Sequence, residues 1–103
     1  MIEVKISLKN EHIYKMKISG HAYQAPYGED LVCAGASSIA TGLLNALDIL
    51  VPSSCKLVLK DYISVQVVED SEVVQTILRT GMIQLETIAE QYGDYLKVIK
   101  QEV

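Results

Sequence analysis

Residues 31–50 form a largely apolar run without an internal proline, and this run limits the fold of the 103-residue chain more than any other feature. The run is rich in alanine, leucine, isoleucine and small residues, and it holds no proline before Pro52. Twenty such residues are too many for a typical strand, so we expect a helix over Leu31–Leu50 with Asp30 as its N-cap. The polar positions of this run recur at helical spacing and are Ser37, Thr41, Asn45 and Asp48. One narrow stripe is therefore polar, and we expect most of the helix surface to be covered.

The segments around this helix are shorter, and their alternating apolar residues predict strands. Polar and turn-forming residues separate them. The expected strands are Ile2–Leu8, Ile13–Ser19, Cys55–Leu59, Ile63–Glu69 and Leu96–Val103, and Asp70, Ser71 and Glu72 offer caps to a second, amphipathic helix that ends near Tyr92 and Gly93. We therefore predict one α+β domain over residues 1–103, with a mixed or antiparallel sheet, two helices packed on one face, and the order β-β-α-β-β-α-β.

Charge and cysteine content narrow the function classes. The formal net charge is −4 and the pI is near 5.0, which favours a basic polypeptide over nucleic acid as the partner. The alternating N-terminus, interrupted by Glu3 and Lys5, matches neither a signal peptide nor a membrane helix. We expect a cytoplasmic protein with reduced thiols, no membrane partner and no cofactor. Scattered ligands at His12, His21, Cys33 and Cys55 make a metal site a poor interpretation.

A loop of about ten residues separates the first hairpin from the long helix. It contains two glycines, a proline and two tyrosines, and long ordered loops often carry function. We expect it to cover a bound peptide and to move about its flanking glycines, although a rigid structural loop is an equal alternative. The candidate substrate-loop residues are Gly20, Tyr23, Gln24, Ala25, Pro26, Tyr27 and Gly28.

Cys33 follows the expected cap by three residues, beside the N–H groups and positive dipole at the start of the helix. That dipole contributes about 0.3 to 1 kcal/mol, whereas an imidazolium about 4 Å away contributes on the order of 4 kcal/mol at an effective dielectric near 20. A histidine is thus the stronger means of stabilising a thiolate. His21 begins the loop that leads to this helix and is a better candidate than His12 in the hairpin turn. The alternative is that Cys33 is an inert core residue, as we expect for Cys55.

The motifs Gly20-His21-Ala22 and Asp30-Leu31-Val32-Cys33-Ala34-Gly35-Ala36-Ser37 resemble those of the ribosomal-processing cysteine protease family, Prp, of Firmicutes and related bacteria. The resemblance extends over the whole chain in length and element order. It implies that His21 is the catalytic histidine and Cys33 the nucleophile. Asp30 and Ser37 fall on two other characteristic positions, where each has a structural or a supporting role. Leu31 and Gly35 differ from the commoner isoleucine and alanine.

The same resemblance implies a substrate and an assembly. The family removes an N-terminal extension from a large-subunit ribosomal protein, the twenty-seventh of that set, and its members are typically homodimers. The small residues Gly35, Ser38 and Gly42 would serve that contact or internal packing. Two alternatives stay open: a non-catalytic ribosome-assembly module that binds the same basic tail, and an anion-binding domain at the helix N-terminus. Glu29 and Asp30 argue against the second alternative.

Overall fold

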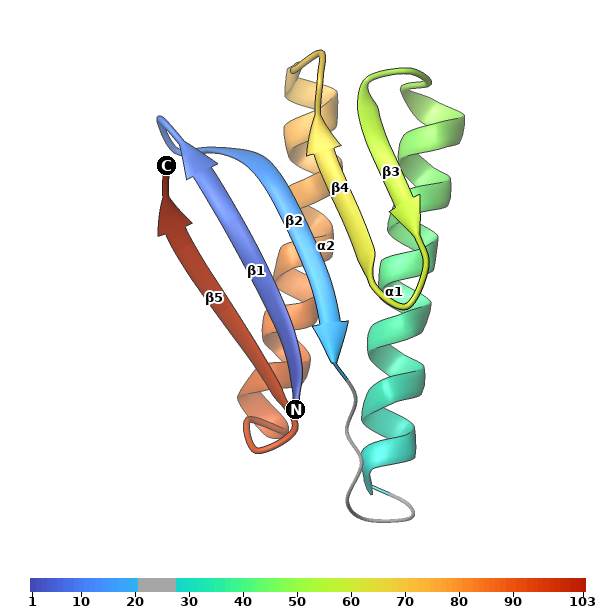
Figure 1. The fold of residues 1–103 in the computed structure, drawn as a ribbon, viewed down its shortest axis with the longest axis vertical. Coiled ribbons are helices and arrows are strands. Elements are labelled where there is room, and N and C mark those ends of the chain that lie inside the picture. The colour runs from blue at the N-terminus through green and yellow to red at the C-terminus, as the bar shows by residue number, and fades with distance from the viewer. Residues whose placement is uncertain (21–27) are drawn as a thin grey trace.

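The computed structural model describes residues 1–20 and 28–103, with the side chains of 28–30 left out. Five strands and two helices follow one another in the predicted order (Figure 1). They are β1 (Ile2–Lys9), β2 (His12–Gly20), α1 (Gly28–Leu50), β3 (Cys55–Leu59), β4 (Ile63–Val67), α2 (Glu72–Gln91) and β5 (Leu96–Glu102). The sheet order is β3-β4-β2-β1-β5, and both helices lie on one face of it. The predicted α+β architecture is confirmed.

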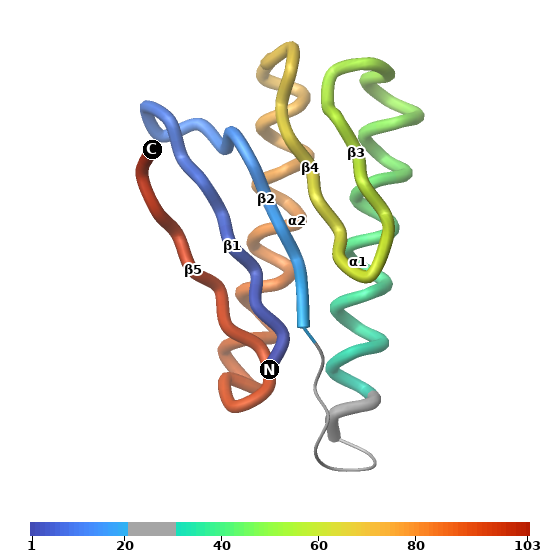
Figure 2. The backbone as a smooth tube through the Cα atoms, in the orientation of Figure 1, coloured from blue at the N-terminus to red at the C-terminus, as the bar shows by residue number. Residues whose placement is uncertain are grey.

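The sheet is mixed because β5 pairs in parallel with β1, whereas the other neighbours are antiparallel. The tube in Figure 2 shows the N-terminus beside the start of β5, where the Ile2 N–H donates to the Tyr95 carbonyl at 2.8 Å. The β1–β2 turn uses Asn10 and Glu11, both with positive φ (50° and 69°), as a tight two-residue hairpin requires. These pairings make β2 the central strand and place β1 between it and the edge strand β5.

The core lies between the helices and the covered face of the sheet. Ile2, Val4 and Ile6 of β1 alternate with more exposed residues and are buried there, and Val4 and Ile6 are fully inaccessible. The helices contribute Ala36, Ala40, Leu43, Leu44 and Leu47 from α1 and Val74, Leu78 and Leu85 from α2. Residues 31–50 are apolar and long enough to cross a membrane by composition, with a mean hydropathy of 1.3. Within that span 33% of the residues are buried, on the face that joins the core. The expectation that most of the helix surface is covered was wrong, because the sheet and α2 cover only one side of α1 and leave Leu31, Ile49 and Leu50 exposed.

The start of α1 differs from the sequence-based expectation. The helix begins at Gly28, so Asp30 is its third residue and Cys33 its sixth, rather than the N-cap and the third residue. Carboxylates are favourable at the N-cap and throughout the first turn, because both lie near the positive end of the dipole. Sequence pattern alone therefore did not locate the first turn, and the Asp30 N-cap prediction was wrong.

The other boundaries agree more closely. Ser71 caps α2 by accepting a hydrogen bond from the Val74 N–H at 3.1 Å, as predicted. Strand β4 ends at Val67, two residues earlier than expected. The reason is that the Ser54 carbonyl accepts from the N–H groups of Val68 and Glu69, at 2.8 and 2.9 Å, which removes both residues from the ladder.

Candidate functional site

A cavity of about 340 Å³ lies against the first half of α1, where β2 ends and the β3–β4 turn approaches. Cys33 lines this cavity. Its side chain is partly buried, so it is neither a fully buried core residue nor a fully exposed one. The lining residues are Ile2, Ile18, Ser19, Gly20, Cys33, Ala36, Ser37, Ala40, Thr41, Leu59, Lys60, Asp61, Tyr62 and Ile63. The structure thus brings three predicted site residues, Gly20, Cys33 and Ser37, to one cavity.

One face of α1 supplies the helical wall. Cys33, Ser37 and Thr41 lie at intervals of four residues, which places them above one another on a helix. The Thr41 hydroxyl donates to the Ser37 carbonyl at 2.7 Å. This hydrogen bond fixes the Thr41 side chain against the helix backbone. The Ser37 side chain is exposed at this wall one turn beyond Cys33. Ser37 could contact substrate from this position or serve only as a structural surface residue. These are the two roles that the sequence analysis left open.

Gly20 forms the point at which the chain leaves the sheet. Its φ of +89° is a conformation that residues with side chains rarely adopt. A Cβ built on it would overlap the Met1 carbonyl oxygen. Glycine is therefore required here to let β2 end against the start of β1, and the next residue in the sequence is His21.

The third wall comes from residues that sequence reasoning assigned to a plain turn: Lys60, Asp61 and Tyr62. Pairing of Ile18 with Ile63 brings this turn to the end of β2. The Lys17 ammonium lies 4.8 Å from the centre of the Tyr62 ring, which links the turn to β2. No local motif marks these residues, since the β2–β4 pairing joins segments more than forty positions apart.

Several predicted site residues lie outside the described part of the chain. These are His21, Tyr23, Gln24, Pro26 and Tyr27, together with the side chain of Asp30. Gly28 is described as the first residue of α1. The distance between His21 and Cys33 and an orienting role for Asp30 thus stay predictions, whereas the start of α1 at Gly28 excludes the N-cap role.

The second cysteine has a different environment. Cys55 begins β3, and burial raises the pKa of its thiol. The Ser54 hydroxyl donates to its sulfur at 3.6 Å and opposes this rise, whereas the negative charge of Asp70 adds to it. Among the described residues, Cys55 and Cys33 form no disulfide, and no group of three His, Cys, Asp or Glu side chains is placed to hold a metal ion.

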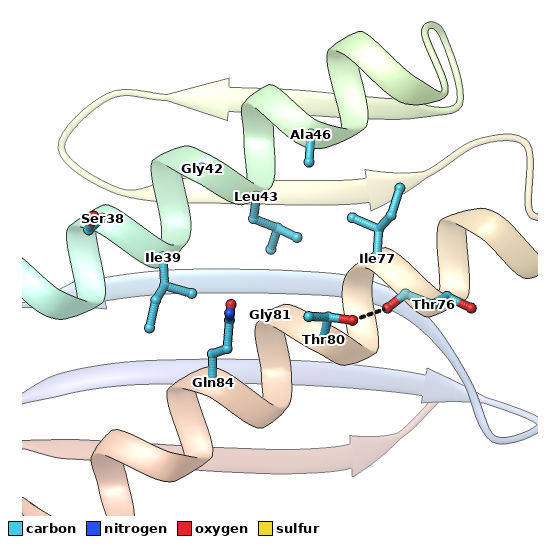
Figure 3. A pocket seen from close by; sticks show the side chains of 10 residues that line it. All are labelled: Ser38, Ile39, Gly42, Leu43, Ala46, Thr76, Ile77, Thr80, Gly81 and Gln84. Atoms are coloured by element: carbon cyan, nitrogen blue, oxygen red, sulfur yellow. Dashed lines mark hydrogen bonds between the residues drawn. The ribbon is translucent and has the colours of Figure 1, made fainter.

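A second cavity, of about 490 Å³, lies between α1 and α2 on the side away from the sheet. Figure 3 shows Ile39 and Leu43 of α1 facing Ile77 and Gln84 of α2 across it. Its lining has no acidic or basic side chain and no cysteine or histidine. We therefore place the chemistry at the Cys33 cavity.

The fold and a partly exposed thiol at the wall of a cavity define a candidate thiol enzyme, and comparison with known proteins gives its class. The family model described as Cysteine protease Prp matches residues 1–97. The ribosomal processing cysteine protease Prp of Staphylococcus aureus strain Mu50 is 31% identical over 103 residues, covering 95% of this chain and 97% of the relative. The Bacillus subtilis strain 168 protein of the same name is 32% identical, covering 92% and 95%.

Solved structures agree with this match. The Staphylococcus aureus ribosomal processing protease Prp with a covalently linked product peptide has a TM-score of 0.86 at 31% identity, covering 98% of this chain and 100% of the other. The same protease with a substrate peptide gives 0.88 at 29% identity, with the same coverage. SMU.848 of Streptococcus mutans, at 22% identity and a TM-score of 0.88, supports the fold alone, over 100% of this chain and 96% of that one. The chain belongs to the Prp family, and it is a cysteine protease.

Proposed function

We propose that this protease removes the N-terminal extension of a large-subunit ribosomal protein, the twenty-seventh of the set, through a dyad of Cys33 and His21. The observation that carries the proposal is the place of Cys33 on a cavity whose edge includes Gly20, the residue before His21, in a chain of the Prp family. The relatives are named ribosomal processing proteases, and one of them is described with a substrate peptide. The precursor is made in the cytoplasm, where we place the enzyme.

In the proposed reaction, the Cys33 thiolate attacks the scissile carbonyl carbon and forms a tetrahedral intermediate. Its collapse breaks the C–N bond, and His21 gives a proton to the leaving amine. Water, deprotonated by His21, then hydrolyses the thioester and restores the thiol. The reaction needs no cofactor, because the protons cycle between the thiol, imidazole and water.

The position of Cys33 in α1 limits how this thiolate is stabilised. The dipole effect falls off within the first turn of a helix, and Cys33 is the sixth residue of α1. His21 is therefore the main source of the stabilising charge in this mechanism. The backbone N–H of Cys33 is also committed, because the N–H of a sixth helical residue bonds to the carbonyl of the second. We assign the oxyanion to donors other than that group.

The test is cleavage of the extended ribosomal precursor, followed by mass spectrometry of the product. Cys33→Ala removes the nucleophile and should lower kcat at least about 1000-fold, whereas His21→Ala should lower it about 100- to 10,000-fold. The chain supplies a matched control for each residue type: Cys55→Ala and His12→Gln should cleave at wild-type rates when folded.

The same assay separates the proposal from its alternative. A non-catalytic assembly module would bind the precursor equally well before and after Cys33→Ala and give no product with the wild-type chain. Cleavage by folded Cys33→Ala at the wild-type rate would refute the nucleophile, and the same result with His21→Ala would refute the base. Loss of cleavage in Cys55→Ala with circular dichroism unchanged would move the chemistry to the other thiol.

A further inference from the structure

The sheet has one face that no helix covers, and we call the side chains on it the open sheet face. The helices lie behind the sheet in Figure 1, so this face is turned towards the viewer. Directly paired residues share a face, and the registers define three rows across the strands. The rows are Lys97, Glu3 and Ser19; Ile99, Lys5, Lys17, Ser64 and Val58; and Gln101, Ser7, Lys15, Gln66 and Lys56.

Positive charge is concentrated on these rows. They hold five of the nine basic residues of the chain and one of its thirteen acidic residues, Glu3. Four of the lysines are exposed and Lys15 is partly buried. The chain as a whole carries −4, so its negative charge lies on other surfaces. The open sheet face is a positive surface on an acidic protein.

The arrangement of these lysines is unfavourable for the isolated protein. Lys5 and Lys17 are directly opposite each other on neighbouring strands, where like charges destabilise the pair. Among the described residues, the ion pair on this face joins Lys5 to Glu3 at 3.9 Å, and both side chains are more than 40% exposed, so its contribution is small. An anionic ligand would remove this repulsion.

Two tyrosines border the lysines. The Lys9 ammonium lies 4.5 Å from the centre of the Tyr14 ring, and Lys17 lies 4.8 Å from that of Tyr62. The Gln66 amide donates to the Tyr14 hydroxyl at 3.0 Å, which fixes this ring beside the third row. Each ammonium lies over the face of its ring. A single-stranded base stacking on that face would displace the lysine, which could then contact a phosphate.

Charge and shape select among possible occupants. A second copy docked by this face would bring two sets of lysines together. A lipid surface would require large apolar side chains to insert, and the exposed large apolar residues of the described chain lie outside the three rows. The basic substrate of the proposed protease would be repelled. A phosphate backbone matches the charge, and aromatic rings match its bases.

We propose that the open sheet face binds single-stranded RNA. The choice of RNA over DNA rests on the proposed function, which places this protease beside proteins destined for ribosomal RNA. The expectation of no nucleic-acid partner came from net charge, which averages the open sheet face with the acidic remainder of the surface. Ser19 of the first row and Tyr62, which borders the lysines, also line the Cys33 cavity. RNA bound by the lysines would therefore lie next to that cavity and hold the enzyme near its substrate.

The test is fluorescence anisotropy of a labelled 20-nucleotide RNA of mixed sequence, titrated with the wild-type chain at several salt concentrations. Five phosphate contacts predict a slope of log K against log salt near −3.5, or about a 100-fold loss of affinity between 50 and 200 mM salt. Lys15→Gln combined with Lys56→Gln should reduce the slope by about 1.4 and weaken binding about 25-fold at 0.1 M salt.

The matched control is Arg79→Gln combined with Lys100→Gln, which removes the same charge from α2 and the helix side of β5. It should leave the salt slope unchanged. Three results would overturn the proposal. They are equal weakening of binding by both double variants, binding that does not depend on salt, and binding to single-stranded DNA or phosphatidylglycerol vesicles but not to RNA. The anisotropy assay contains no ribosomal precursor, so its result tests RNA binding independently of the cleavage that tests the proposed function. The Lys15 and Lys56 double variant should still cleave the isolated precursor.

Discussion

Single residues decide how the site meets the sheet, and Gly20 is the clearest case. Its positive φ and the closeness of the Met1 carbonyl leave no room for a side chain. The sequence marked Gly20 as the edge of a functional loop, but nothing local to it predicted the contact with Met1. That contact depends on the pairing of Ile2 with Gly20 at the far ends of two strands.

Gly20→Ala should destabilise the protein by about 2 kcal/mol or more, because it adds both a strained φ and a clash with backbone. The measurement is the free energy of unfolding in urea. Gly42→Ala is the matched control, since a Cβ on Gly42 meets nothing within 4 Å. It should stabilise α1 by about 0.5 to 1 kcal/mol. Equal stability of the Gly20→Ala variant and the wild type would contradict the assigned conformation.

The residues of the candidate site differ in how far sequence could predict them. Cys33 and Ser37 share a helix face, and a spacing of four residues is visible in the chain. Lys60, Asp61 and Tyr62 were missed because their place depends on which strands become neighbours. Strand order is set by packing over the whole sheet, and short alternating segments do not encode it locally.

At the scale of elements, one polar cluster joins the first hairpin to the start of α2. His12 Nδ1 lies 2.7 Å from an Asp70 carboxylate oxygen, and the other oxygen accepts from the Gln75 amide at 2.9 Å. Gln75 is buried and bonds both the N–H and the carbonyl of Ile13. The cluster satisfies backbone groups at the hairpin that would otherwise be buried without partners.

This cluster predicts a dependence of stability on acid. Desolvation is the largest influence on the Asp70 carboxyl and acts to raise its pKa, but hydrogen bonds from Gln75, His12 and the Ser71 N–H, with the charge of His12, lower the pKa below the ordinary value of 3.8. The unfolded chain therefore takes up the proton first as pH falls. The contribution of Asp70 is complete above pH 3.8 and is lost as pH falls through its folded pKa.

Asp70→Asn should lower the free energy of unfolding at pH 7 and make it less dependent on pH between 4 and 2. Urea unfolding at a series of pH values measures both effects. Asp48→Asn, at an exposed position of α1, makes the same chemical change away from the cluster and should keep the wild-type pH profile. An unchanged acid dependence in the Asp70 variant would show that other carboxylates produce it.

Element types were more predictable than element limits. The alternation of β1 and the apolar run of α1 are strong periodic signals, and both elements appear where expected. The ends of an element depend on which carbonyl accepts each backbone hydrogen bond. At the end of β4, the Ser54 carbonyl accepts from two N–H groups and so ends the strand. The first turn of α1 was misplaced because acidic residues favour several positions near a helix start.

At the scale of the whole molecule, the two layers present very different outer surfaces. The sheet presents lysines, whereas the helices present the uncharged groove of Figure 3, between α1 and α2. The layer arrangement was predictable from hydrophobic pattern alone. The separation of charge between the layers was not, because it needs the strand registers.

The family resemblance predicts a homodimer, and charge favours the helix layer over the open sheet face as its contact. Light scattering after size exclusion should give twice the chain mass of 11.4 kDa. Thr80→Arg places a long cation in the groove and should give a monomer that still unfolds cooperatively. Ser7→Arg, on the open sheet face, should remain a dimer. A monomeric wild-type chain at 100 μM would rule out this assembly.

The length of α1 has a mechanical consequence for the enzyme. Leu44 is anchored in the core and Cys33 lies eleven residues earlier, about 16 Å along the same continuous helix. A tilt of about 5° around that anchor would move Cys33 by about 1.4 Å, and a misplacement of about 1 Å can reduce a rate about 100-fold. A small tilt of α1 is therefore amplified at Cys33. A loss of core packing around the helix that is too small to unfold the protein would first be measured as a lower kcat.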